Sequence, residues 1–315
     1  MQMNMIKGAF FLEEITEDII EQIIASGINE ISLKWEHYDN ELVNLLRTSN
    51  IKVYIEVSLF VSEELWQKYP DSRPLDRDGK LMDPINWYYG VCPNHVKVRE
   101  EKLSIIARII ETFNFDGLWL DFIRYPCHWE AARDSNITEY CFCKNCLEKF
   151  EKDRGGSPEG DAWVAWKCQQ ITEFVRDVRE RVDLSGKNIQ LGMFAVPWIG
   201  NTCGNAIHSI VCQDFPRLSK YIDVFGVMTY HKLADQSANW IEEVVDKLAK
   251  ITGKPVVPLV QSIDTPTLIS KEDFEHSIGL AVGEPSKGVI IFHFHDLLAN
   301  QRKYEVVKKL FTTEL

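Results

Sequence analysis

The sequence predicts an α/β protein of the (β/α)8, or TIM-barrel, class, with long loops after the third and fourth strands. Eight short runs rich in β-branched and aromatic residues recur along the 315-residue chain, and each has the length of a buried strand. Helical patterns alternate with these runs, which is typical of parallel crossover units. Eight such units in a chain of this length indicate a closed barrel. The predicted strands span residues 6–12, 28–35, 51–60, 116–125, 189–198, 221–230, 255–263 and 288–298.

Amphipathic stretches supply the predicted helices. Their apolar residues recur at helical spacing, and Gly27 follows the first pattern at the position where glycine commonly ends a helix. A doubly wound sheet is the weaker alternative, because no G-x-G-x-x-G motif follows the first strand. The clearest helical patterns cover residues 17–27, 98–113, 166–182, 239–250 and 303–311.

Two predicted connections are much longer than the others, at about residues 61–95 and 126–165. Both follow the carboxyl end of a strand, which is the end of a barrel where barrel enzymes carry their active sites. Loops of this length are usually functional or contain structure of their own. No repeat or linker divides the chain, so we expect a single catalytic barrel domain over residues 1–315.

Composition and charge restrict the partners. The formal net charge of −12 disfavours nucleic-acid binding, which depends on lysine and arginine against phosphate. No apolar run approaches the ~18 residues of a membrane span, and the first residues do not resemble a signal peptide. We therefore expect a cytoplasmic protein that binds neither nucleic acid nor membrane. The sequence leaves homo-oligomerisation open.

Three cysteines crowd into the stretch YCFCKNC (140–146) of the second long loop. In a reducing compartment, clustered thiols favour a metal site over disulfides. Tetrahedral zinc takes four ligands, with sulfur at about 2.3 Å. Free buried thiols are the alternative interpretation, because cysteine often packs as a small apolar residue. The candidates for a fourth ligand are Cys92, Cys127, His128 and Cys168.

Two segments together resemble the zinc-binding pattern of the family 42 β-galactosidases. VCPNHVKVREE (91–101) resembles their Cys-Pro-Asn before a helix, and YCFCKNCLEKFEKDRGG (140–156) resembles their Cys-x-Cys-x-x-Cys before a Phe-containing helix. A site closed by four thiolates is structural, because it leaves no position open for water. The resemblance therefore implies a structural zinc ion that joins the two long loops. Its ligands would be Cys92, Cys141, Cys143 and Cys146.

Asp121 is the leading catalytic candidate. It lies near the end of an apolar strand in FDGLWLDFIRYP (115–126), so its carboxylate either faces the barrel mouth or carries a steep desolvation cost. Arg124 can pair with it or bind a substrate hydroxyl, and a purely structural ion pair is the alternative. The segment resembles the fourth strand of the α-amylase and α-fucosidase families, where an aspartate is the nucleophile, and it most resembles a group of hypothetical glycoside hydrolases. The resemblance implies a glycosidase.

Glycoside hydrolysis needs a second carboxyl group. Family 42 enzymes carry an acid/base Glu on strand 4 and a nucleophile Glu on strand 7, but here strand 7 offers Gln261 and Asp264 instead. The chitinase pattern fails as well, because Ile123 and His231 stand where that family has Glu and Asp. By position at strand ends, the candidate partners rank as Asp296, then Asp264, then Glu36.

Polar and aromatic residues near the predicted strand ends suit a sugar site. Aromatic faces stack on pyranose rings, although core packing is the alternative for some, and histidines can bind hydroxyls or tune an acid. Two other functions stay open: a non-catalytic carbohydrate-binding barrel, and a metal-dependent hydrolase that uses the strand-8 histidines with Asp296. The predicted substrate-binding residues are Trp35, Glu36, His37, Arg124, Trp198, Tyr230, His231, Gln261, His293 and His295, and further aromatic candidates are Trp87, Tyr88 and Trp129.

Overall fold

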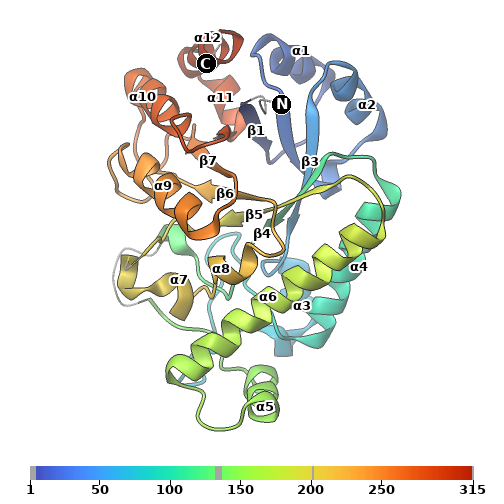
Figure 1. Ribbon diagram of the computed structural model, residues 1–315, viewed down its shortest axis with the longest axis vertical. Coiled ribbons are helices and arrows are strands. Elements are labelled where there is room, and N and C mark those ends of the chain that lie inside the picture. Colours follow the sequence, from blue (N-terminus) through green and yellow to red (C-terminus); the bar gives the residue numbers. More distant parts are fainter. Residues whose placement is uncertain (1–4, 132–136, 201, 314–315) are drawn as a thin grey trace.

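The chain folds into a closed barrel of parallel strands in sequence order, as predicted (Figure 1). The structure is a computed structural model, and it describes residues 5–131, 137–200 and 202–313. Strand β8 pairs with β1 and closes the barrel, with Ile6 opposite Gly288. The strands are β1 (Ile6–Phe11), β2 (Glu30–Lys34), β3 (Lys52–Ser58), β4 (Gly117–Asp121), β5 (Gln190–Ala195), β6 (Val224–Met228), β7 (Val256–Gln261) and β8 (Gly288–Phe292).

Helices surround the barrel and also fill the two long loops. The first long loop contains a short helix at residues 63–68, and the second contains a helix at residues 144–153. The following helix begins at Gly160, earlier than the helical pattern predicts, and with its predecessor it extends beyond the barrel as a lobe (Figure 1). The helices are α1 (Glu17–Ala25), α2 (Asn40–Thr48), α3 (Glu63–Lys68), α4 (Val96–Thr112), α5 (Lys144–Asp153), α6 (Gly160–Leu184), α7 (Ala206–Ser209), α8 (Phe215–Leu218), α9 (Trp240–Thr252), α10 (Lys271–Ala281), α11 (Phe294–Ala299) and α12 (Gln301–Thr312).

Large aromatic rings fill the inside of the barrel. The ring of Phe10 on β1 lies 5.7 Å from that of Phe194 on β5 and 5.4 Å from that of Phe292 on β8. Phe194 stacks in turn on Trp119 of β4, with ring centroids 4.8 Å apart. Gly192 makes room for this stack, because a Cβ atom there would lie 2.3 Å from the Trp119 ring. These rings identify the inward faces of β1, β4, β5 and β8, because side chains alternate between the two faces of a strand.

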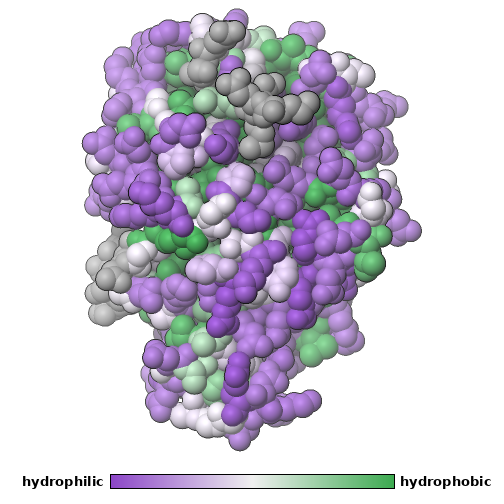
Figure 2. Space-filling model, viewed as in Figure 1, coloured by the Kyte–Doolittle hydropathy of each residue, from purple (hydrophilic) through white to green (hydrophobic). Residues whose placement is uncertain are grey.

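The face of the molecule shown in Figure 2 is mostly hydrophilic. Hydrophobic residues are scattered among the hydrophilic ones. Within the described residues, no helix combines the length and the apolar character that crossing a bilayer requires.

Candidate active site and cysteine cluster

Asp121 is the last residue of β4 and faces the inside of the barrel, two positions beyond Trp119. The next residue, Phe122, has a φ of 49°, which turns the chain out of the strand. The N–H of Phe122 donates a 2.6 Å hydrogen bond to Asp121 Oδ1. Burial raises the pKa of Asp121, while the charges of Arg124 and Lys34 and this hydrogen bond act in the opposite direction. The predicted position of Asp121 at a strand end is therefore confirmed.

Arg124 is a buried cation, with 1% of its surface exposed. Within the described residues, none of its three guanidinium nitrogens has a hydrogen-bond partner, and its guanidinium lies 4.8 Å from the centre of the Phe122 ring. Burial disfavours the charged form, but the neighbouring Tyr88, Glu130 and Asp121 raise its pKa. Arg124 therefore supplies a positive charge that acts on two carboxyl groups.

Glu130 is the second of these carboxyl groups, and sequence reasoning missed it. It lies in the 3-10 helix η3 (Trp129–Ala131) of the second long loop. Burial raises its pKa to about 7, although Arg124 lowers it, and the charge of Asp121 raises it further. Glu130 Oε2 lies 3.7 Å from His128 Nε2. Burial, with help from Arg124, lowers the pKa of His128, which favours a neutral imidazole beside this acid.

Glu56 is a third acid near Asp121 that the sequence analysis overlooked. It lies on β3, opposite Trp119 of β4, and is 2% exposed. Ser58 pairs with Asp121 in the same register, and its hydroxyl donates a 2.8 Å hydrogen bond to Glu56 Oε1. Burial raises the pKa of Glu56, and the charge of Asp121 raises it further. Glu56 therefore lies one layer below Asp121, and its pKa of about 8 keeps it largely protonated near neutrality.

Tyr230, which follows β6, is buried within reach of the charge of Asp121. Its ring lies 4.8 Å from that of Phe292 and stacks at 6.1 Å on that of Trp129, so it faces the barrel interior. Burial raises the pKa of its hydroxyl, and the charges of Asp121 and Glu130 raise it further. Tyr230 therefore stays a neutral phenol beside both carboxyl groups.

The three carboxyl groups predicted as partners of Asp121 have other surroundings. Asp264 forms a 2.5 Å ion pair with Lys303. Burial favours its neutral form, but the hydrogen bond from Lys303 contributes most to holding the pKa of Asp264 below its usual value. Asp296, in α11, lies 3.1 Å from His293 Nε2 and is partly exposed. Glu36 is exposed in η1 (Trp35–His37), although its charge raises the pKa of Glu56.

The predicted substrate-binding residues have different local surroundings. Gln261 is buried, and its Nε2 donates to the carbonyls of Ile263 and Thr265. Its Oε1 accepts from an N–H of the loop after β6, so the side chain connects the loops after β6 and β7. His231 lies against α10, 3.7 Å from Asp273, and burial lowers its pKa. Of the predicted residues, Arg124 lowers the pKa of Asp121, and the charge of Asp121 in turn raises the pKa of Tyr230.

The remaining predicted residues lie around the β1, β2, β5 and β8 ends. Trp35 packs under Arg108, whose guanidinium is 5.0 Å from its ring, and His37 lines a groove with Glu36 between α1 and α2. Trp198 is buried after β5. His293 and His295 follow β8, with ring centroids 6.5 Å apart; His293 pairs with Asp296, and His295 Nε2 lies 3.9 Å from Glu13.

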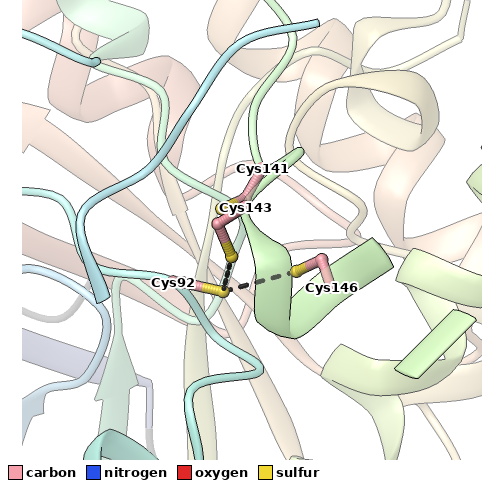
Figure 3. Close-up of side chains that lie close together, drawn as sticks. All are labelled: Cys92, Cys141, Cys143 and Cys146. Carbon is pink, nitrogen blue, oxygen red and sulfur yellow. Dashed lines mark hydrogen bonds between the residues drawn. The ribbon is translucent and has the colours of Figure 1, made fainter. Parts of the chain in front are cut away.

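Four cysteines come together between the two long loops, with their side chains directed toward one another (Figure 3). All four are buried, and their Sγ atoms lie within 4.8 Å of one another. Cys92 Sγ is 3.4 Å from Cys146 Sγ and 3.5 Å from Cys143 Sγ, much longer than the ~2.05 Å of a disulfide. Within the described residues, this is the one cluster of three or more potential metal-ligand atoms, so the strand-8 histidines do not form another.

The surroundings of the cluster suit thiolate ligands. Asn94 Nδ2 donates to Cys146 Sγ at 3.3 Å and to Tyr125 Oη at 2.7 Å, and the Asn94 N–H donates to Cys92 Sγ. Such donors orient metal ligands and stabilise their charge. Of the candidates for a fourth ligand, the structure brings Cys92 to the other three, whereas Cys168 Sγ donates to the carbonyl of His208 and His128 stacks on Tyr88.

Comparison with known proteins shows what this fold resembles. The PgaB (BpsB) glycoside hydrolase domain from Bordetella bronchiseptica superposes with a TM-score of 0.74 at 12% identity, over 99% of this chain and 100% of that domain. The β-galactosidase from the psychrophilic Marinomonas ef1 gives 0.73 at 10% identity, over 96% of this chain and 58% of that one. A catalytic mutant of Gan42B, a GH42 β-galactosidase from G. stearothermophilus, gives 0.69 at 13% identity, over 98% of this chain and 56% of that one.

These similarities establish the shared barrel fold and place glycoside hydrolases among its structural neighbours. The chain spans a little over half the length of the two β-galactosidases. No protein-family model matches the sequence, and no curated protein matches it. Fold alone does not determine function, so the chemistry has to be argued from the residues of the site.

Proposed function

We propose that this protein is a glycoside hydrolase in which Asp121 and Glu130 form the catalytic pair. The observation that carries the proposal is the pair itself: two carboxyl groups share the influence of one buried arginine, Arg124, at the carboxyl end of β4. Carboxyl groups whose surroundings give them different protonation states are what acid catalysis with a second, ionised carboxylate requires. The hydrolase neighbours of the fold support the same class of reaction.

The surroundings of each carboxyl group suggest its role. Burial raises the pKa of both carboxyl groups. For Asp121, the charge of Arg124, the Phe122 N–H and the charge of Lys34 act against it, whereas Glu130 has a pKa of about 7 and keeps much of its proton near neutrality. In hydrolysis, Glu130 would protonate the glycosidic oxygen as its bond to the anomeric carbon breaks. Asp121 would attack that carbon or activate the water that does so, and water supplies the proton and hydroxyl of the products.

The proposal is tested with purified protein and a panel of aryl α- and β-glycosides of common hexoses and pentoses. Hydrolysis of at least one glycoside is expected, together with its loss in Asp121→Asn. An absence of turnover across the panel and on unsubstituted oligosaccharides would favour the non-catalytic carbohydrate-binding alternative.

The pH dependence of the reaction is expected to report Glu130. Because this acid must be protonated, kcat/KM of the wild-type protein should fall as the pH rises above about 7. On the acid side, kcat/KM should fall as Asp121 gains a proton. Glu130→Gln should lower kcat/KM by about 10²–10³-fold on substrates with poor leaving groups and remove the alkaline limb. An unchanged alkaline limb in the variant would assign that titration to another group.

We further propose that the four-cysteine cluster binds one structural zinc ion. Tetrahedral zinc with Zn–S distances of about 2.3 Å requires sulfur–sulfur distances of about 3.8 Å, and small outward movements of Cys92, Cys143 and Cys146 would meet this value. Bound zinc would hold the two long loops together. Four thiolates would leave the ion no open position, so the proposed chemistry belongs to the carboxyl groups.

A further inference from the structure

Trp87 is a large aromatic residue that the fold leaves in contact with solvent. It lies in the loop after β3 and is 56% exposed. Its ring centroid lies 5.8 Å from that of Phe122, 5.3 Å from that of His128 and 5.7 Å from that of Tyr88. The indole therefore rests on a cluster of rings and presents the rest of its surface outward.

The rings beneath Trp87 connect it to both proposed catalytic carboxyl groups. Phe122 directly follows Asp121 in the chain and donates its N–H to that carboxylate. His128 lies 3.7 Å from Glu130. One residue therefore separates the indole from each member of the pair, on the side of the site formed by the two long loops.

Trp87 is held on a braced loop. The N–H of Tyr88 donates to the carbonyl of Ile85 at 2.9 Å, and the Tyr88 hydroxyl accepts a 2.9 Å hydrogen bond from the N–H of Cys127 in the other long loop. Five residues after Trp87, the same loop enters the cysteine cluster through Cys92. A ligand that binds the indole would meet a surface already in place, which lowers the ordering cost of binding.

We propose that Trp87 forms a second sugar-binding subsite and that the substrate is a neutral oligosaccharide with at least two sugars. This inference rests on the proposed hydrolase function. One sugar would occupy the position between Asp121 and Glu130, and the next would stack the apolar face of its ring on the indole. The net charge of −12 disfavours anionic sugars, and the positive charge of Arg124 near both carboxyl groups disfavours cationic ones, so the proposed ligand class is neutral.

The test compares aryl glycosides of one, two and three sugars, from the series that the wild-type protein hydrolyses. Trp87→Ala is expected to lower kcat/KM for the two- and three-sugar substrates about tenfold more than for the one-sugar substrate. Trp87→Phe should restore most of that difference, because it keeps an aromatic face. Leu184, the last residue of α6, is 86% exposed, and Leu184→Ala is the matched control. It should leave the ratio of kcat/KM between long and short substrates unchanged.

Direct binding separates this inference from the proposed function. Calorimetry measures the binding of neutral sugars to wild type and to Trp87→Ala. The ligands have one to four sugars and include β-1,4-linked galactan, glucan and xylan fragments. Length-dependent binding that Trp87→Ala loses, without hydrolysis, would support the subsite and contradict the hydrolase. Hydrolysis with a substrate ratio unaltered by Trp87→Ala would support the hydrolase and overturn the subsite. If neither binding nor hydrolysis is observed, both proposals are overturned, and a contact with a protein partner at Trp87 is favoured instead.

Discussion

Asp121→Asn is expected to lower kcat by about 10³-fold or more while the protein stays folded. Asparagine keeps the size of the side chain, and its Oδ1 can still accept the hydrogen bond from the Phe122 N–H. The substitution removes only the negative charge that the reaction needs at the carboxyl end of β4. Steady-state kinetics on the best substrate of the glycoside panel measures the effect, and circular dichroism and metal content confirm that the fold persists.

Asp296→Asn is the matched control for this variant. It removes the same charge from an aspartate just after β8, but Asp296 is partly exposed in α11 and pairs with His293. We expect it to keep most of the activity. Loss of activity in Asp296→Asn with full activity in Asp121→Asn would place the catalytic centre at β8 and contradict the proposed pair.

Loss of one cysteine ligand is expected to have the largest effect on stability. Cys92→Ser and Cys143→Ser should reduce bound zinc from one ion per chain to a small fraction of that value, as measured by elemental analysis after dialysis. Because ligand binding to the folded state stabilises it, the free energy of unfolding should fall by about 3 kcal/mol or more. Activity should fall as well, since the cluster joins the loops that carry Trp87 and Glu130.

Cys203→Ser provides the control for the cysteine variants. Cys203 is partly exposed and lies outside the cluster, so its substitution should change neither zinc content nor stability appreciably. Two results together would contradict the zinc proposal. The wild-type protein would contain no zinc after expression in zinc-supplemented medium, and chelators would not change its melting temperature.

The sequence predicts the barrel well because local patterns determine it. Apolar β-branched runs mark the strands, but β4 is shorter than its run because Phe122 adopts a positive φ, for which phenylalanine gives no sequence signal. The cysteine cluster was also predictable, because three of its members share one short stretch and Cys92 completes a recognisable pattern.

The acids around Asp121 were harder to find. Glu56 does leave a signal in retrospect: it is a carboxyl group inside an apolar strand, and it shares an alternating face with Tyr54 and Ser58. Glu130 leaves none, because it lies in a short 3-10 helix of a long loop and its burial depends on the tertiary packing of that loop. Ranking carboxyl groups by strand-end position placed Asp296 first and Asp264 second. In the fold, Asp296 pairs with His293 and Asp264 forms an ion pair with Lys303.

In the proposed mechanism, Glu130 acts as the acid opposite Asp121. The most direct test is how the activity of Glu130→Gln depends on the acidity of the leaving group. The measurement is kcat/KM of wild type and variant on aryl glycosides whose phenols range from strongly acidic, such as 2,4-dinitrophenol, to weakly acidic. On substrates whose phenols leave without protonation, the variant should be nearly as active as wild type. The difference in kcat/KM between the two proteins should grow as the phenol becomes less acidic. A uniform loss across the series would contradict the assignment of Glu130 as the acid.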